Sequence, residues 1–123
     1  MAGMSTYLRN ALLNTLRNQS FSVATVYVSL HDDDPGDSGD NEITGGSYAR
    51  QAVTLTQPSG GASESVADVE FTDLPAVTLT HVGLWDAATN GNFLWGGPLT
   101  QSKAVDAGDS FVVLAGDLDL EIS

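Results

Sequence analysis

The residues of this sequence that could most readily do chemistry are six acidic side chains within residues 31–46, HDDDPGDSGDNEITGG. Clustered carboxylates are the ligands that hard cations such as Ca²⁺ prefer, so Asp32, Asp34 and Asp37 are candidate metal ligands. An EF-hand register does not fit, because placing Asp32 first puts Ile43 where the bidentate acid should stand. Two interpretations therefore remain open: a loop that binds Ca²⁺ or another cation, and an acidic loop exposed to solvent.

Signatures of catalysis are missing from the sequence. It has no cysteine, no G-x-S-x-G, no P-loop and only two histidines, His31 and His81, without a second histidine within four residues of either. His31, beside the acids, could be a metal ligand or an exposed imidazole, whereas His81 is expected in the core or an interface. The sequence predicts a protein that is not an enzyme and has no cofactor, apart from a cation in the acidic loop.

The two tryptophans offer a different chemistry, because sugar sites present an aromatic face beside Asp and Asn side chains. Trp85 and Trp95 lie close in sequence to Asp86, Asn90 and Asn92. One interpretation is therefore an exposed platform for carbohydrate. The other is a pair of tryptophans buried in the core or in a subunit contact.

The charge balance excludes several partners. Sixteen acidic residues against four basic ones give a net charge of -12 and a pI near 4.1. Such a surface repels nucleic acid and anionic membranes. The N-terminus does not read as a signal peptide, and no stretch approaches the roughly 20 apolar residues of a membrane span. Because molar salt shortens the Debye length to about 3 Å and screens self-repulsion, the composition predicts a halophilic source.

The element that must position the tryptophans is a hairpin over Val77–Thr100. Asn90-Gly91 stands between two apolar runs and favours a turn with positive φ at both residues. A turn centred there gives the hairpin two apolar faces. They hold Val82, Leu84, Phe93 and Trp95 on one side and Leu79, Trp85 and Leu94 on the other. The hairpin is then either an inner strand pair of a sandwich or the part of a sheet that meets another subunit; a loop of odd length would reverse one strand.

One helix is predicted over residues 5–17. Ser5 can cap its start, Leu8 and Leu12 begin a stripe with four-residue spacing, and Arg17 falls in the last turn, where the helix dipole favours a cation. A helix this short must dock on something. That is either its own sheet or a neighbouring subunit.

Arg50 is the only basic residue between Arg17 and Lys103. In so acidic a chain it is expected to form an ion pair or to bind carbonyl groups. A role in a subunit contact is the alternative.

Short alternating segments at spacings of 8 to 12 residues make up the remainder. They are predicted at residues 25–30, 50–56, 65–71, 103–105, 110–114 and 117–122. Together with the hairpin they predict a mainly β fold, an antiparallel β-sandwich of about 7–8 strands over residues 23–123. With the helix, this forms a single domain of residues 1–123.

Three blocks of the sequence resemble a family of small virion proteins of tailed phages, usually labelled tail fibre or minor tail proteins. The blocks are EITGGSYARQAVTL at 42–55, THVGLWDAATNGNFLWGGPLT at 80–100 and KAVDAGDSFVVLAGDLDL at 103–120. The resemblance implies a structural, non-enzymatic subunit with a β-rich fold. It leaves open whether the subunit sits on the tail or on the capsid.

We therefore expect a virion protein, assembled in the host cytoplasm, that contacts itself as a homo-oligomer and docks on other virion proteins. Its acidity within the family suggests a haloarchaeal tailed virus. The predicted interface residues are Leu8, Leu12, Arg50, Trp85, Phe93 and Trp95. The alternative is a host-attachment module that binds carbohydrate or Ca²⁺ on the host surface.

Overall fold

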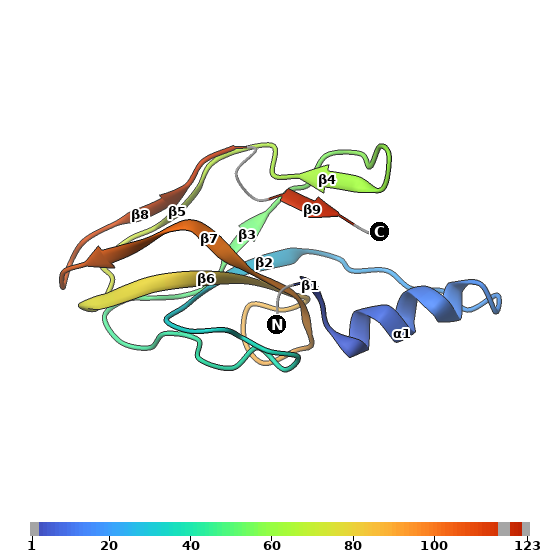
Figure 1. Cartoon of the computed structure of the whole chain (residues 1–123), viewed down its shortest axis with the longest axis horizontal. Coiled ribbons are helices and arrows are strands. Elements are labelled where there is room, and N and C mark those ends of the chain that lie inside the picture. The colour runs from blue at the N-terminus through green and yellow to red at the C-terminus, as the bar shows by residue number, and fades with distance from the viewer. Residues whose placement is uncertain (1–2, 116–118, 122–123) are drawn as a thin grey trace.

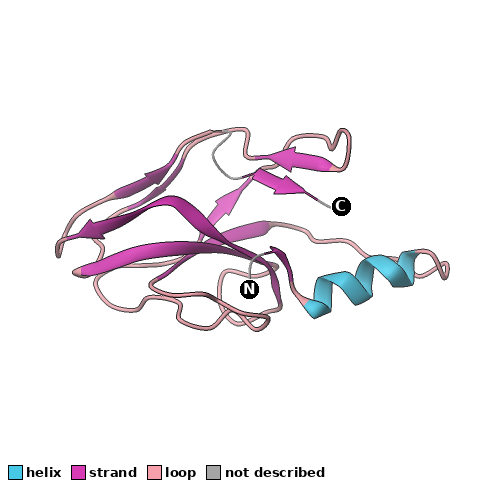
Figure 2. Cartoon of the chain, in the orientation of Figure 1, coloured by secondary structure: helices cyan, strands magenta, loops and turns pink. Residues whose placement is uncertain are grey.

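The computed structural model describes residues 3–115 and 119–121 of the 123-residue chain. Within them the fold is mainly β, with antiparallel strands and one N-terminal helix, as predicted (Figure 2). The helix is α1 (Thr6–Thr15). The strands are β1 (Gly3–Met4), β2 (Val26–His31), β3 (Gln51–Val53), β4 (Ala62–Glu64), β5 (Val69–Phe71), β6 (Val77–Trp85), β7 (Phe93–Val105), β8 (Phe111–Val113) and β9 (Asp119–Glu121).

The predicted hairpin is the centre of the largest sheet. Five strands pair in the order β1-β7-β6-β2-β3, so β6 lies between its hairpin partner and β2. Two short ribbons, β4 with β9 and β5 with β8, accompany this sheet (Figure 1). Every strand pair among the described residues is antiparallel.

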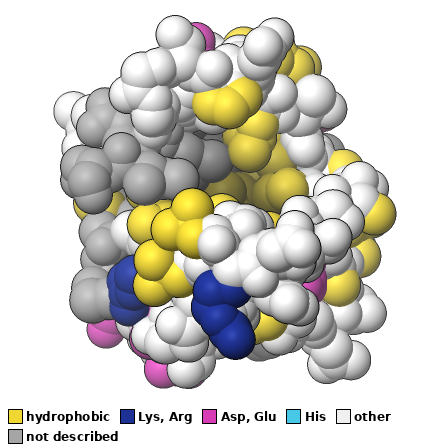
Figure 3. All heavy atoms as spheres, turned by 90° about the vertical axis from the view of Figure 1, so that its right-hand side faces the viewer, with side chains coloured by type: hydrophobic (Ala, Val, Ile, Leu, Met, Phe, Trp, Pro, Cys, Tyr) yellow, Lys and Arg dark blue, Asp and Glu magenta, His cyan; other side chains and the backbone are white. Residues whose placement is uncertain are grey.

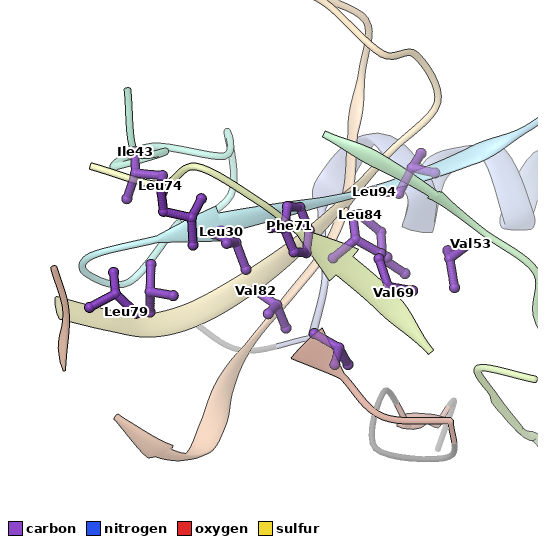
Figure 4. Packing of buried hydrophobic residues seen from close by; sticks show 13 residues of the cluster. Leu30, Ile43, Val53, Val69, Phe71, Leu74, Leu79, Val82, Leu84 and Leu94 are labelled. Carbon is purple, nitrogen blue, oxygen red and sulfur yellow. The ribbon is translucent and has the colours of Figure 1, made fainter. Parts of the chain in front are cut away.

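The core lies between the large sheet and the β5–β8 ribbon. Figure 4 shows Phe71 of β5 pointing among aliphatic side chains of β2 and β6, and Phe71 is 1% exposed. Apolar residues alternate on the inner faces, as the period of two in a strand requires. The core cluster includes Val28, Leu30, Val69, Leu74, Leu79, Val82, Leu84, Leu94 and Val113.

The turn of the hairpin carries the predicted conformation but is longer than predicted. Asn90 and Gly91 have φ of 54° and 79°, the left-handed values expected of an Asn-Gly turn. However, β6 ends at Trp85 and β7 begins at Phe93, which leaves a loop of seven residues, 86–92. This odd length changes the pairing of the two strands.

The predicted faces of the hairpin are correspondingly wrong in part. Leu84 pairs with Trp95, but Trp85 pairs with Phe93, so Leu94 is an extra residue in the ladder. A second irregularity lies between Leu79 and His81. As a result Phe93 shares the face of Trp85, whereas Leu79 and Leu94 join Val82 and Leu84 in the core.

Helix α1 begins where predicted. Ser5 is its N-cap, and the Ser5 Oγ accepts a hydrogen bond from the Leu8 N–H at 3.1 Å. The helix ends at Thr15, so Arg17 lies beyond the last turn and donates to Oδ1 of Asn14 instead. No residue of α1 is buried, and the helix extends away from the sheets (Figure 1). Only its first part packs on the chain's own core, through Leu8.

Several of the predicted strands differ in extent. The segment 50–56 is shortened to β3, and residues 103–105 are the end of β7 and not a separate strand, because β7 continues past Pro98 to Val105. In the predicted segment 65–71 only the last three residues form a strand, β5. A separate short strand, β4, precedes this segment and follows a turn at Gly60 and Gly61, which both have positive φ. The predicted strand 117–122 is represented by β9, and residues 117, 118 and 122 lie outside the described residues. In the described part of the chain, no helix is long and apolar enough to cross a membrane.

Candidate functional site

The acidic loop covers the second face of the hairpin. Gly39 lies so close to that face that a Cβ added to it would clash with the Trp85 ring and stand 2.8 Å from Phe93. Pro35 is fully buried, and its Cγ would meet a Cβ at Gly96 at 2.7 Å. Trp85 is therefore 8% exposed and Phe93 5% exposed within one chain. The second apolar face needs no neighbouring subunit to cover it, which corrects that expectation.

Under this loop runs a chain of buried polar groups. The indole N–H of Trp85 donates to Oγ of Ser29 at 2.8 Å, and Ser29 Oγ lies 2.6 Å from Nε2 of His31. Nδ1 of His31 lies 2.7 Å from the carbonyl oxygen of Asp40, which can only accept, so Nδ1 carries the proton. Nε2 then accepts from Ser29. These hydrogen bonds connect β6, β2 and the acidic loop.

His31 is held neutral by its position. Burial lowers its pKa from 6.5, although the hydrogen bond to Asp40 and the nearby Glu42 charge act in the other direction. A Ser beside a His is also the geometry of an activated nucleophile. Here Ser29 and His31 are both 0% exposed, so no substrate reaches the pair. His31 is neither the metal ligand nor the exposed imidazole that the sequence allowed.

Arg50 joins three parts of the chain at the tip of the hairpin. Its Nε and Nη2 donate to the two carboxylate oxygens of Glu42 at 3.0 and 2.9 Å. Its Nη1 donates to the carbonyl oxygens of Ala87 and Asn90 at 3.0 and 2.8 Å, inside the 86–92 loop. The guanidinium lies over Trp85, with Cζ 3.7 Å from the ring centroid. Arg50 thus forms the ion pair and also binds carbonyls, the two roles that were expected.

Glu42 is the acceptor that completes this cluster. Besides the Arg50 pair, its Oε2 accepts from the Tyr48 hydroxyl at 2.6 Å, and that hydroxyl accepts from the Leu30 N–H at 3.0 Å. Burial raises the pKa of Glu42, but the hydrogen bonds from Arg50 and Tyr48 outweigh it and bring the pKa below its usual value. Burial and the Glu42 carboxylate raise the pKa of Tyr48. Glu42 therefore stays charged and Tyr48 stays neutral.

The three candidate metal ligands are not brought together. Oδ1 of Asp37 accepts from the N–H and hydroxyl of Thr6 at 2.7 and 3.0 Å, and Arg9 lies 3.6 Å away. Oδ1 of Asp34 accepts from the Gly36 N–H at 2.9 Å, and Asp32 is exposed. Among the described residues, no group of three or more His, Asp or Glu side chains could hold a metal ion. Asp37 instead stabilises the start of α1, where a negative charge is favourable.

The carbohydrate platform is wrong for Trp85. One face of its ring lies against Arg50 and the indole is buried. Asp86 and Asn92, the polar neighbours expected at a sugar site, close the 86–92 loop: Asn92 donates to Asp86 through its backbone N–H at 2.7 Å and its side chain at 2.9 Å. These groups hold the hairpin tip in shape.

Trp95 lies elsewhere, at an open surface beside α1. An apolar hollow of about 400 Å³ is found there, called the apolar hollow below. In Figure 3, which faces the end of the molecule where α1 lies, hydrophobic side chains gather around this recess. The lining includes Leu8, Val26, Leu55, Ala62, Leu94 and Trp95. Of the predicted interface residues, Leu8 and Trp95 thus share one surface, whereas Arg50, Trp85 and Phe93 are internal and Leu12 lies farther along α1.

These features describe a β-rich domain in which buried polar groups fix loops on a sheet. The family model described as "Podophage GP4 fiber I protein gp80" matches residues 3–121, and the chain belongs to this family. The match confirms the resemblance to tail and fibre proteins of tailed phages and places the chain among structural proteins of the virion. No curated protein matches the chain.

The Arg50 cluster makes a prediction about stability. Arg50→Met leaves Glu42 partly buried without its cation, so the free energy of unfolding should fall by about 3 kcal/mol in urea titrations. Lys103→Met, at an exposed cation, should change it by no more than about 0.5 kcal/mol. The double variant Glu42→Gln/Arg50→Met should lose less than the sum of its single changes. Equal, small losses in both Met variants would contradict this role of Arg50.

The buried His31 predicts a dependence on pH. Its pKa is lower in the folded chain, so the unfolded chain takes up the proton first as pH falls below 6.5. The contribution of His31 to the free energy of unfolding is therefore complete above pH 6.5. It declines below that pH, with a slope of up to about 1.4 kcal/mol per pH unit. Urea unfolding between pH 6.5 and 5.5 should show this slope in the parent and in His81→Asn. The His31→Asn variant should be less stable, and its free energy of unfolding should change little over the same pH range. If this variant kept the slope of the parent, His31 would not be the source of the pH dependence.

Proposed function

We propose that this chain is a non-enzymatic subunit of the tail fibre apparatus of a tailed virus, where it forms a homo-oligomer and docks on other virion proteins. The observation that carries the proposal is membership, over residues 3–121, in a podophage fibre family. Fibre subunits act through their surfaces. The chemistry inside the domain therefore serves to hold those surfaces in a fixed shape.

The buried contacts support this reading of the domain. Arg50 fixes the hairpin tip, and His31 fixes the acidic loop, both by hydrogen bonds to backbone carbonyl groups. Among the described residues, every buried side-chain nitrogen and oxygen has a hydrogen-bond partner. A domain whose loops are fixed in this way can bind partners without first ordering them, which lowers the entropic cost of assembly.

The surface chemistry suits protein partners in water. Its strong negative charge disfavours nucleic acid and anionic membranes. Asp32, Asp33 and Asp34 are exposed on the acidic loop and do not line the apolar hollow. We assign the partner contacts to the end with α1 and the apolar hollow, and the acidic loop to the solvent side.

The proposed function is tested on purified virions. Mass spectrometry should detect the chain at a constant number of copies per particle, and gold-labelled antibody should mark the tail in electron micrographs. Label on the capsid would instead make the chain a capsid decoration protein. Particles that lack the chain at every purification step would contradict a structural role.

The proposed haloarchaeal source makes a separate prediction. Molar NaCl should raise the melting temperature by about 5 °C or more over 0.1 M NaCl, because it screens repulsion among surface acids and about 1 kcal/mol corresponds to such a shift. Thermal melts followed by circular dichroism would measure this. Asp32→Asn/Asp33→Asn, which removes two exposed charges, should gain less from salt. A melting temperature independent of salt would argue against a halophilic virus.

A further inference from the structure

The second half of α1 is exposed to an unusual degree for an apolar helix. Leu13 is 62% exposed and Leu16 is 83% exposed. The helix has ten residues and no buried one, and isolated helices below about 12 residues are marginal in water. Its start is held by Ser5 and Asp37. The segment after the helix returns beside it, with the Gln19 N–H donating to the Asn14 carbonyl oxygen at 3.2 Å, but it leaves Leu13 and Leu16 exposed. These leucines are therefore available to a partner.

Charge is divided unevenly along the chain. Residues 1–31 contain Arg9 and Arg17 and no acidic residue. Residues 32–123 contain all sixteen acids against Arg50 and Lys103, a formal charge of -14. The helix is thus a weakly basic, apolar projection on a strongly acidic body. An acidic surface, such as the body of a second copy, would attract it.

The apolar hollow offers such a helix a matching surface. Its volume of about 400 Å³ is within the range of pockets that enclose apolar groups. Residues 61–63, at and beside β4, line one side of the hollow, and β4 pairs with β9, where Asp119 stands opposite Glu64 in the strand register. Glu121 occupies the register position opposite Ala62, a lining residue of the hollow. An apolar floor thus lies beside acidic strand positions.

We propose that the second half of α1 of one copy docks in the apolar hollow of a second copy, an inference that rests on the proposed homo-oligomeric fibre function. Leu13 and Leu16 enter the hollow, and Arg17 lies toward the acidic β4–β9 ribbon. The contact joins two different surfaces, so its repetition generates a filament or a ring according to the rotation between copies, and the smallest ring is a two-fold dimer in which each helix enters the other copy's hollow. Burial of the two leucines supplies the main driving force.

A second copy is favoured over another partner by complementarity within the chain. Like-charged acidic bodies repel each other, and a contact through the acid-free helix brings them together with the least repulsion. The helix and the hollow also lie at the same end of the molecule (Figures 1 and 3). Each copy can therefore offer both halves of the contact.

The test uses two variants that each remove one half of the contact. Leu13→Gln/Leu16→Gln makes the helix polar but keeps helix-forming residues. Ala62→Trp fills the hollow. The control Val66→Gln/Leu114→Gln changes two residues that are equally apolar and are 50% and 54% exposed but do not line the hollow. Oligomeric mass is measured by light scattering over a concentration series in 0.15 M and 2 M NaCl, with circular dichroism as the check on folding.

We expect the parent and the control to associate, and both test variants to show at least a tenfold weaker self-association with unchanged melting. A mixture of the two test variants should form a one-to-one complex, because one intact helix then meets one intact hollow. A monomeric parent, or an Ala62→Trp variant that associates like the parent, would overturn the inference. The chain's presence in virions is measured separately, so a monomeric parent found in particles would refute this contact and leave the virion role standing.

Discussion

The arrangement of the loops depends on one guanidinium. Arg50 binds both oxygens of Glu42, two carbonyl groups of the hairpin loop and the face of Trp85. A lysine has no planar fork to make these contacts at once, so the position requires arginine. Arg50 itself directly precedes β3, and its partners belong to the acidic loop, the loop at the tip of the hairpin and the end of β6, so one side chain fixes how these segments meet. Glu42 cancels its charge, which allows the cluster to be 9% exposed at Arg50.

Close packing of backbone on sheet is the second constraint. The acidic loop approaches the hairpin at positions where no side chain would fit. A Cβ at Gly83 would lie 2.7 Å from Phe93 and 2.8 Å from His31, and Gly39 and Gly96 are equally confined. These glycines let a polar loop lie against Trp85 and Phe93 and keep water away from His31. A sheet with two apolar faces is thereby covered on both sides by a single short chain.

Local patterns were enough to predict much of the fold, and distance in sequence explains most of what was missed. Ser5 as N-cap, β2 and the Asn90-Gly91 turn follow from short-range rules, and the structure confirms them. The prediction of the hairpin faces was wrong in part, because the loop has seven residues and Leu94 is an extra residue in β7. Both features shift which side chains share a face, and neither can be seen in a sequence pattern of period two. Arg50 was expected to bind an anion or carbonyls, but its partners lie 8, 37 and 40 residues away. The glycines on the acidic loop and on the strands are the sequence feature that indicates where the loop packs closely on the sheet.

The same separation of inside from outside explains how so acidic a chain can fold. Glu42, paired with Arg50, adds no net charge to the interior, and His31 is neutral there. Among the described residues no other carboxylate side chain is buried, so these charges lie where salt can screen them without disturbing the buried networks. Surface acidity and internal order are thus independent properties of this fold. The number of exposed carboxylates can therefore differ between ionic environments while the loops keep their shape.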